Sequence, residues 1–195
     1  MTRQDVSAVP RPPRADAVRN RAKVLEAASE AFAAEGLAVP LDEIARRAGV
    51  GAGTVYRHFP TKEALFEAVI TERVLGLVVD LEQRLASDAD AGEAFFGFFF
   101  TVINTGRAKA DLAEALAAAG AGLAPETKQA AERLTNGFGA LLKRAQRAGA
   151  VRSDISNEEL HALAVAAMAG EKRAAADPNY ERGRMTRIIC DGLRA

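Results

Sequence analysis

The chain has 195 residues, of which 49% are hydrophobic and 27% are charged, and its formal net charge is +0. This composition excludes wholesale disorder, and the neutral total means that any affinity for nucleic acid must come from a local basic patch. Cys190 is the only cysteine, which excludes an intrachain disulfide framework and a cysteine-based zinc cluster and leads us to expect a reducing, cytoplasmic location.

The N-terminal stretch is basic. Most of the early positive charges lie between Arg3 and Lys23, against only Asp5 and Asp16, and the stretch is opened by Arg11-Pro-Pro-Arg14. We predict a flexible basic arm over residues 1–15 that reaches phosphates or a minor groove. A solvated disordered tail is the alternative interpretation of the same residues.

The remainder of the chain is predicted to be helical. Residues with strong helix propensity recur throughout, and no sustained alternation of apolar and polar residues indicates a half-buried strand. We therefore predict an all-α fold of about nine helices. The first spans about residues 16–35, with Leu25, Ala28 and Phe32 on its apolar face and Gly36 as its C-terminal stop.

Two short helices are predicted next, at about residues 41–48 and 51–59. The Gly49-Val50 turn separates them, and a tight turn between helices needs one residue with a positive φ, which costs glycine least. This pattern predicts a helix-turn-helix. By helical spacing, we expect three side chains of the turn and the second short helix to face the core: Val50, Val55 and Phe59.

A long helix is predicted after the Pro60-Thr61 break, with Thr61 as its cap and apolar positions from Leu65 to Leu85. Further helices are predicted at about residues 91–105, 109–119, 125–148, 157–175 and 179–193. Their ends are marked by Pro125, Gly149 and a Ser156–Glu159 capping box. The richest apolar run, residues 95–103, is too short to span a bilayer, and the N-terminus lacks the apolar core of a signal peptide, so we expect no membrane anchoring.

The second short helix carries residue types that suit a DNA major groove. Three small residues at the start of this helix allow its backbone to approach bases or phosphates closely: Gly51, Ala52 and Gly53. Hydrogen-bond donors follow within little more than two turns: Thr54, Tyr56, Arg57, His58 and Lys62. Arg57 can hold guanine N7 and O6 together, and Lys62 is expected to contact a phosphate. For any single lysine or arginine, a plain surface charge is the alternative.

These residues resemble the DNA-binding head of TetR-type repressors. The likeness covers about residues 17–70 and rests on Leu41-Asp-Glu-Ile-Ala-Arg-Arg-Ala-Gly-Val50, Gly53-Thr-Val-Tyr-Arg-His-Phe59 and Lys62-Glu-Ala-Leu65. It implies that Tyr56 and Lys62 contact phosphates and that Ala52, Gly53, Thr54, Arg57 and His58 lie at the groove. Leu41 and Gly51 stand where many members have hydroxyl side chains, so neither supplies a hydroxyl contact.

The resemblance implies three parts: the arm (1–15), a DNA-binding domain (16–62) and a helical regulatory and dimerisation domain (63–195). A homodimer would bind palindromic double-stranded operator DNA, and an unknown small-molecule effector would release it. The last two helices would form the interface, with internal core as the alternative for the same residues: Leu160, Leu163, Ala164, Ala167, Met168, Met185, Ile188, Ile189 and Gly192.

A ligand pocket would be lined by apolar residues with a few polar anchors, although a phenylalanine stripe is more often plain core. The candidates are Phe95, Phe99, Thr101, Ile103, Asn104, Leu116, Phe138, Leu142 and His161.

Other functions receive less support from the sequence. Gly51-Ala-Gly53 lacks the third glycine and the preceding strand of a nucleotide-binding loop, and no catalytic or metal-binding motif is present, so we expect no enzyme activity, no cofactor and no metal. The remaining alternatives are an activator, a regulator that senses a protein partner, and a helical dimer that does not bind DNA.

Overall fold

The computed structural model describes residues 13–118 and 124–195, with side chains described for residues 16–105 and 124–195. These residues form eight α-helices and one 3-10 turn, together with an isolated bridge between Val151 and Arg194. The all-α prediction is confirmed. Residues 1–12 of the predicted basic arm lie outside the described residues. No helix within the described ranges is long and apolar enough to cross a membrane.

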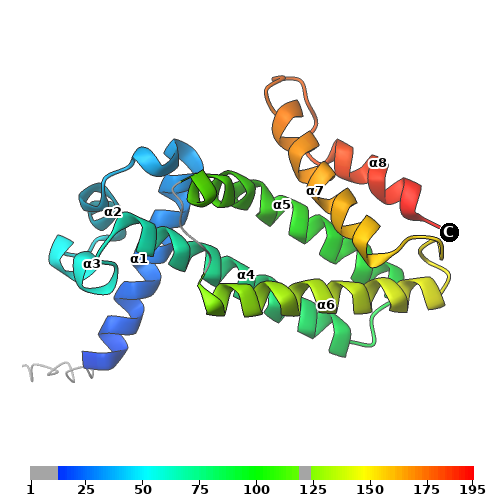
Figure 1. Ribbon diagram of the computed structural model, residues 1–195, viewed down its shortest axis with the longest axis horizontal. Helices are drawn as coiled ribbons and strands as arrows, with labels where there is room; N and C mark the ends of the chain where they lie inside the picture. The colour runs from blue at the N-terminus through cyan, green and yellow to red at the C-terminus, as the bar shows by residue number, and fades with distance from the viewer. Residues whose placement is uncertain (1–12, 119–123) are drawn as a thin grey trace, which may run out of the picture. The chain divides into compact units, whose positions relative to one another are not determined.

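The chain divides into two compact units, Met1–Val69 and Ile70–Ala195. The first contains α1 (Pro13–Glu35), η1 (Gly36–Ala38), α2 (Leu41–Ala48), α3 (Ala52–His58) and the beginning of α4 (Lys62–Ala86). Helix α1 packs against both α2 and α3 (Figure 1). Its predicted apolar face is buried as expected, and the Phe32 ring meets the Phe66 ring edge-on with centroids 5.3 Å apart.

The turn between α2 and α3 depends on one glycine. Gly49 has φ 66° and ψ 32°, in the left-handed region that other residues adopt only at a cost. In this conformation the Gly49 N–H donates to Arg46 O, and the Val50 N–H donates to Ala45 O at 3.1 Å, so the last carbonyls of α2 are satisfied. The turn therefore ends α2 and redirects the chain into α3. Thr61 caps α4 as predicted, because its Oγ1 accepts from the Ala64 N–H at 3.1 Å.

The second unit contains the rest of α4, α5 (Ala91–Ala118), α6 (Pro125–Arg147), α7 (Asn157–Ala174) and α8 (Arg184–Leu193). The helices predicted at 91–105 and 109–119 are one helix, because the intervening Gly106 costs a helix about 1 kcal/mol without ending it. The last helix begins at Arg184 instead of residue 179, after Gly183 at φ 83°. The Ser156–Glu159 capping box is present.

A phenylalanine cluster fills the core of this unit. Phe95, Phe98 and Phe99 of α5 surround Phe138 of α6, with centroids 5.9, 5.2 and 6.2 Å from the Phe138 ring. Helix α5 also packs along α7 and touches α8 (Figure 1). The helices of the second unit are thus assembled around α5.

Candidate nucleic-acid interface

Helix α3 is anchored by one side and exposed on the other. Val55 is fully buried and Phe59, just beyond the helix, is 3% exposed; they are four residues apart and so share a face. Val50, also predicted to face the core, is half-buried. Because α3 is short, these two anchors fix the direction in which its other side chains project.

The predicted DNA-binding residues of this segment lie together on its solvent side. Ala52, Gly53, Tyr56 and Arg57 have the spacing of one helical face and all four are exposed. Gly51 and His58 are also exposed, and Thr54 is half-buried. Arg57 takes part in none of the ion pairs within the described ranges, so its guanidinium presents its donors to solvent.

Lys62 has a structural partner that the sequence does not reveal. It is half-buried at the start of α4, and its Nζ donates to the backbone oxygen of Leu37 in η1 at 2.8 Å. An ammonium group has three N–H donors, so this bond leaves others for a phosphate. The Leu37 carbonyl therefore fixes the position of the Lys62 charge.

A network of opposite charges covers the outer surface of α2. The Glu43 carboxylate accepts from Arg46 through both oxygens and from Arg47 Nε, each at 2.8 Å, and Arg47 also pairs with Glu35 at 2.6 Å. Hydrogen bonds from Arg46 and Arg47 lower the pKa of Glu43 to about 2. The spacing of three and four residues is the sequence signal for such pairs. Two basic side chains of the first unit, Arg46 and Arg47, are thus already paired within the protein.

In the second unit, most residues predicted to line a ligand pocket belong to the core. Five are buried in the phenylalanine cluster: Phe95, Phe99, Ile103, Phe138 and Leu142. Thr101 is half-buried and donates to Gly97 O at 3.0 Å, whereas Asn104 and His161 are exposed. The Leu116 side chain lies outside those described. The structure therefore brings the apolar candidates together as packed core and places the polar anchors Asn104 and His161 on the surface.

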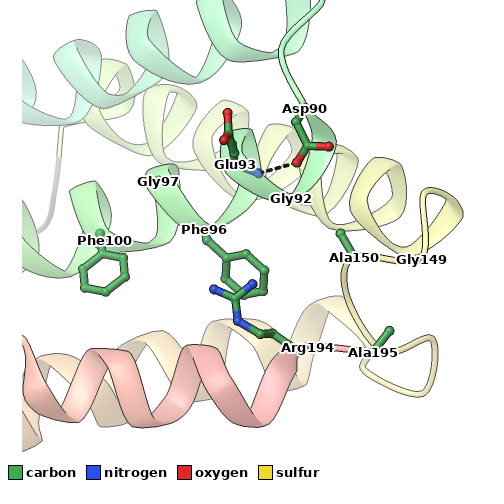
Figure 2. A pocket seen from close by; sticks show the side chains of 10 residues that line it. All are labelled: Asp90, Gly92, Glu93, Phe96, Gly97, Phe100, Gly149, Ala150, Arg194 and Ala195. Atoms are coloured by element: carbon green, nitrogen blue, oxygen red, sulfur yellow. Dashed lines mark hydrogen bonds between the residues drawn. The ribbon is translucent and has the colours of Figure 1, made fainter.

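An open groove of about 620 Å³ lies on another side of α5. Figure 2 shows Phe96 and Phe100 pointing into it from α5, while Arg194 approaches from the end of α8. The Arg194 guanidinium lies 4.5 Å from the centroid of the Phe96 ring. Asp90 and Glu93 contribute carboxylates at its edge. The groove combines an aromatic floor with charges of both signs.

The predicted dimer residues divide into three groups, which are buried, half-buried and exposed. Leu160, Ala164 and Ala167 are at most 2% exposed and belong to the core of the unit, because this side of α7 faces α5. Leu163, Met168 and Ile189 are half-buried. Met185, Ile188 and Gly192 are exposed. Together with four exposed apolar residues of α7 they form what we call the α7–α8 outer face: Ala162, Val165, Ala166, Ala169, Met185, Ile188 and Gly192.

Known proteins match both parts of the chain. Residues 24–69 match the family described as bacterial regulatory proteins, tetR family, and residues 90–195 match the SbtR-like transcriptional regulator C-terminal domain. The TetR transcription regulatory protein of Mycobacterium vanbaalenii, known from a crystal structure, is 46% identical with a TM-score of 0.75, over 94% of this chain and 100% of that one.

Two further relatives extend the comparison. A TetR transcriptional regulator of Streptomyces coelicolor is 34% identical with a TM-score of 0.67, over 89% of this chain and 98% of that one. The HTH-type transcriptional activator FasR of Mycolicibacterium smegmatis is 42% identical over 86 residues, which span 40% of this chain and only 39% of that protein.

Proposed function

The chain belongs to the TetR family and is a DNA-binding transcriptional regulator, and from this premise we propose that it is a repressor that leaves its operator when a small molecule binds its C-terminal unit. The observation that carries the DNA-binding part of this proposal is the exposed face of α3. Tyr56 and Arg57 project from a helix that is fixed behind by Val55 and Phe59. A helix held in this way can enter a major groove without losing its anchors.

We assign separate roles to the DNA-facing residues. Arg57 makes the base-edge contact, because its planar fork fits guanine N7 and O6. Tyr56 and Lys62 contact phosphates, and Gly51, Ala52 and Gly53 allow the backbone to approach the DNA closely. Thr54 and His58 flank the groove-facing side. With so few long side chains at the tip, DNA shape contributes to operator choice.

Footprinting of the DNA upstream of the chain's own gene tests this assignment. Arg57→Ala should relax base preference at one symmetric pair of positions, at a cost of about 1–3 kcal/mol per contact, whereas Lys62→Ala should weaken binding to all sequences and flatten the salt dependence. Arg182→Ala removes an exposed arginine from the other unit and should leave both properties unchanged. Full operator affinity and an unaltered base preference in the Arg57→Ala variant would refute the groove assignment.

The proposed partner is a second copy of the chain, bound through the α7–α8 outer face. Val165, Met185 and Ile188 are 50%, 39% and 56% exposed, and the small residues around them permit close packing of four helices. A dimer of this kind reads two half-sites about 34–36 Å apart or a multiple of that distance, hence a palindrome. Ile188→Glu should give a monomer in sedimentation that loses operator binding, and a dimer that survives this change would exclude the outer face.

The proposed effector binds the helices of the second unit. Because Phe95, Phe99 and Phe138 already fill the core, an apolar ligand at the predicted pocket would have to displace aromatic side chains. Apolar and aromatic compounds should be screened for two effects together: release of a labelled operator and a rise in Tm, which binding to the folded state produces by mass action. A compound that raises Tm while the operator stays bound is a ligand but no inducer.

Activation is the second candidate, because the relative FasR is named an activator. A transcription assay with purified RNA polymerase separates the two functions. A repressor lowers transcript yield from the footprinted promoter in proportion to operator occupancy, and an activator raises it.

A further inference from the structure

Helix α8 is short and few of its side chains are buried. It has 10 residues, and its buried side chains are Thr186, Cys190 and Leu193. An isolated helix of fewer than about 12 residues is marginal in water. The position of α8 on the unit therefore depends strongly on polar contacts at its ends.

The N-terminal end of α8 is capped by a residue from another helix. Gly183 occupies the N-cap position and has no side chain to accept the first N–H groups. Glu171 of α7, which is 2% exposed, takes over this function. Its carboxylate accepts from Gly183 N at 2.9 Å and from both the N–H and the hydroxyl of Thr186 at 3.1 Å.

Tyr180 completes the cap from the connection between α7 and α8. Its hydroxyl accepts from the Met185 N–H at 3.0 Å and hydrogen-bonds to the Glu171 carboxylate. The N–H groups of Gly183, Met185 and Thr186 are thereby satisfied by two side chains that both precede the helix. At the other end, Arg152 N donates to Leu193 O at 3.0 Å. Polar contacts therefore hold α8 at both of its ends.

The same cap places the exposed residues of α8. Met185 lies within the first turn, between Gly183 and Thr186, whose N–H groups donate hydrogen bonds to the Glu171 carboxylate. Its side chain rests on α7, since a Cβ on Gly170 would lie 3.2 Å from Met185 Cε. Ile188 follows one turn later on the same side. Any loosening of the cap moves both residues relative to Val165 of α7.

We propose that Glu171 is the positioning residue of the partner-binding surface: by capping α8 from α7, it holds Met185 and Ile188 in register with Val165 before a second chain arrives. This inference rests on the dimer advanced above. A surface that is only partly preformed binds with a dissociation constant raised by the inverse of the competent fraction. Glu171 therefore sets the affinity of the dimer without touching the partner.

The test compares Glu171→Gln with Glu158→Gln, which removes the same charge from an exposed position on the same helix. Sedimentation equilibrium gives the dimer dissociation constant, and hydrogen–deuterium exchange reports the opening of each helix. Glu171→Gln should raise the dissociation constant by about tenfold or more, since each hydrogen bond to a charged group is worth roughly that factor. Exchange should quicken in residues 184–193 but not in α5, and Glu158→Gln should change neither.

A milder variant covers the case in which Glu171→Gln fails to fold. Tyr180→Phe keeps the carboxylate and removes one acceptor for α8 and one donor to Glu171, so it should produce a smaller change in the same direction. Unchanged exchange in α8 for a dimeric variant, or a change equal to that of Glu158→Gln, overturns the role of Glu171. A wild-type chain that sediments as a monomer at micromolar concentration instead overturns the dimer itself.

Discussion

Two glycines within helices provide a direct test of the packing between α4 and α6. A Cβ on Gly137 of α6 would lie 2.4 Å from Leu81 Cδ2 and 3.1 Å from Leu81 Cγ, whereas carbon atoms prefer separations of about 3.5–4.0 Å. Leu81 is 1% exposed, so its side chain has little room to move aside. Gly137→Ala should therefore carry an overpacking cost of about 1–3 kcal/mol, offset by a gain of about 1 kcal/mol in helix propensity.

Gly76→Ala in α4 isolates the packing cost. Nothing lies within 4 Å of a Cβ at Gly76, so this variant receives only the helix gain and should be more stable than wild type by about 0.5–1 kcal/mol. The two variants should differ by about 1–3 kcal/mol in urea unfolding followed by circular dichroism. If Gly137→Ala proved as stable as Gly76→Ala, the close approach of α4 and α6 at Leu81 would be refuted.

Three further variants probe the turn, a cap and a buried carboxylate. A Cβ at Gly49 would meet no atom within 4 Å, so the cost of Gly49→Ala, about 1–2 kcal/mol, should come from φ 66° alone and appear as a lower Tm of the first unit. Ser156→Ala removes the capping box of α7 and should cost about 1 kcal/mol in urea unfolding, with Ser153→Ala as a control that should cost almost nothing. Burial acts to raise the pKa of Glu171, but hydrogen bonds from Gly183, Thr186 and Tyr180 lower this pKa below the ordinary 4.5. The stability that the carboxylate contributes should therefore be complete well above pH 4.5 and shrink as the pH falls below that value. The unfolding free energies of wild type and Glu171→Gln should accordingly converge between pH 7 and pH 3.

The fold of the first unit was predictable because its signals are local. Gly49 marks the turn, Val55 and Phe59 are spaced by one helical turn, and Thr61 stands directly before the helix that it caps. Each of these features acts within a few residues along the chain, so sequence spacing describes it adequately. The bond from Lys62 to Leu37 joins residues 25 positions apart, and no spacing rule indicates it.

The second unit was harder to predict because α7 carries apolar residues on both of its sides. Leu160 and Ala164 face the core, whereas Val165 and Ala166 face solvent, and alanine on every face removes the amphipathic contrast that would indicate the inner side. Glu171 presents a related difficulty, since a glutamate in a helix is usually exposed. Its burial depends on donors 12 and 15 residues away, beyond a connection whose path the sequence does not predict.

The burial of Cys190 gives the chain an internal reporter. This thiol is 2% exposed within α8, and burial raises its pKa to about 11, so the reactive thiolate is scarce while the helix stays docked. As the only cysteine in the chain, it can react with a thiol reagent at a single position. The rate of that reaction then measures how often α8 detaches from the unit. It can be measured in the unmodified protein, with and without operator DNA or candidate inducers.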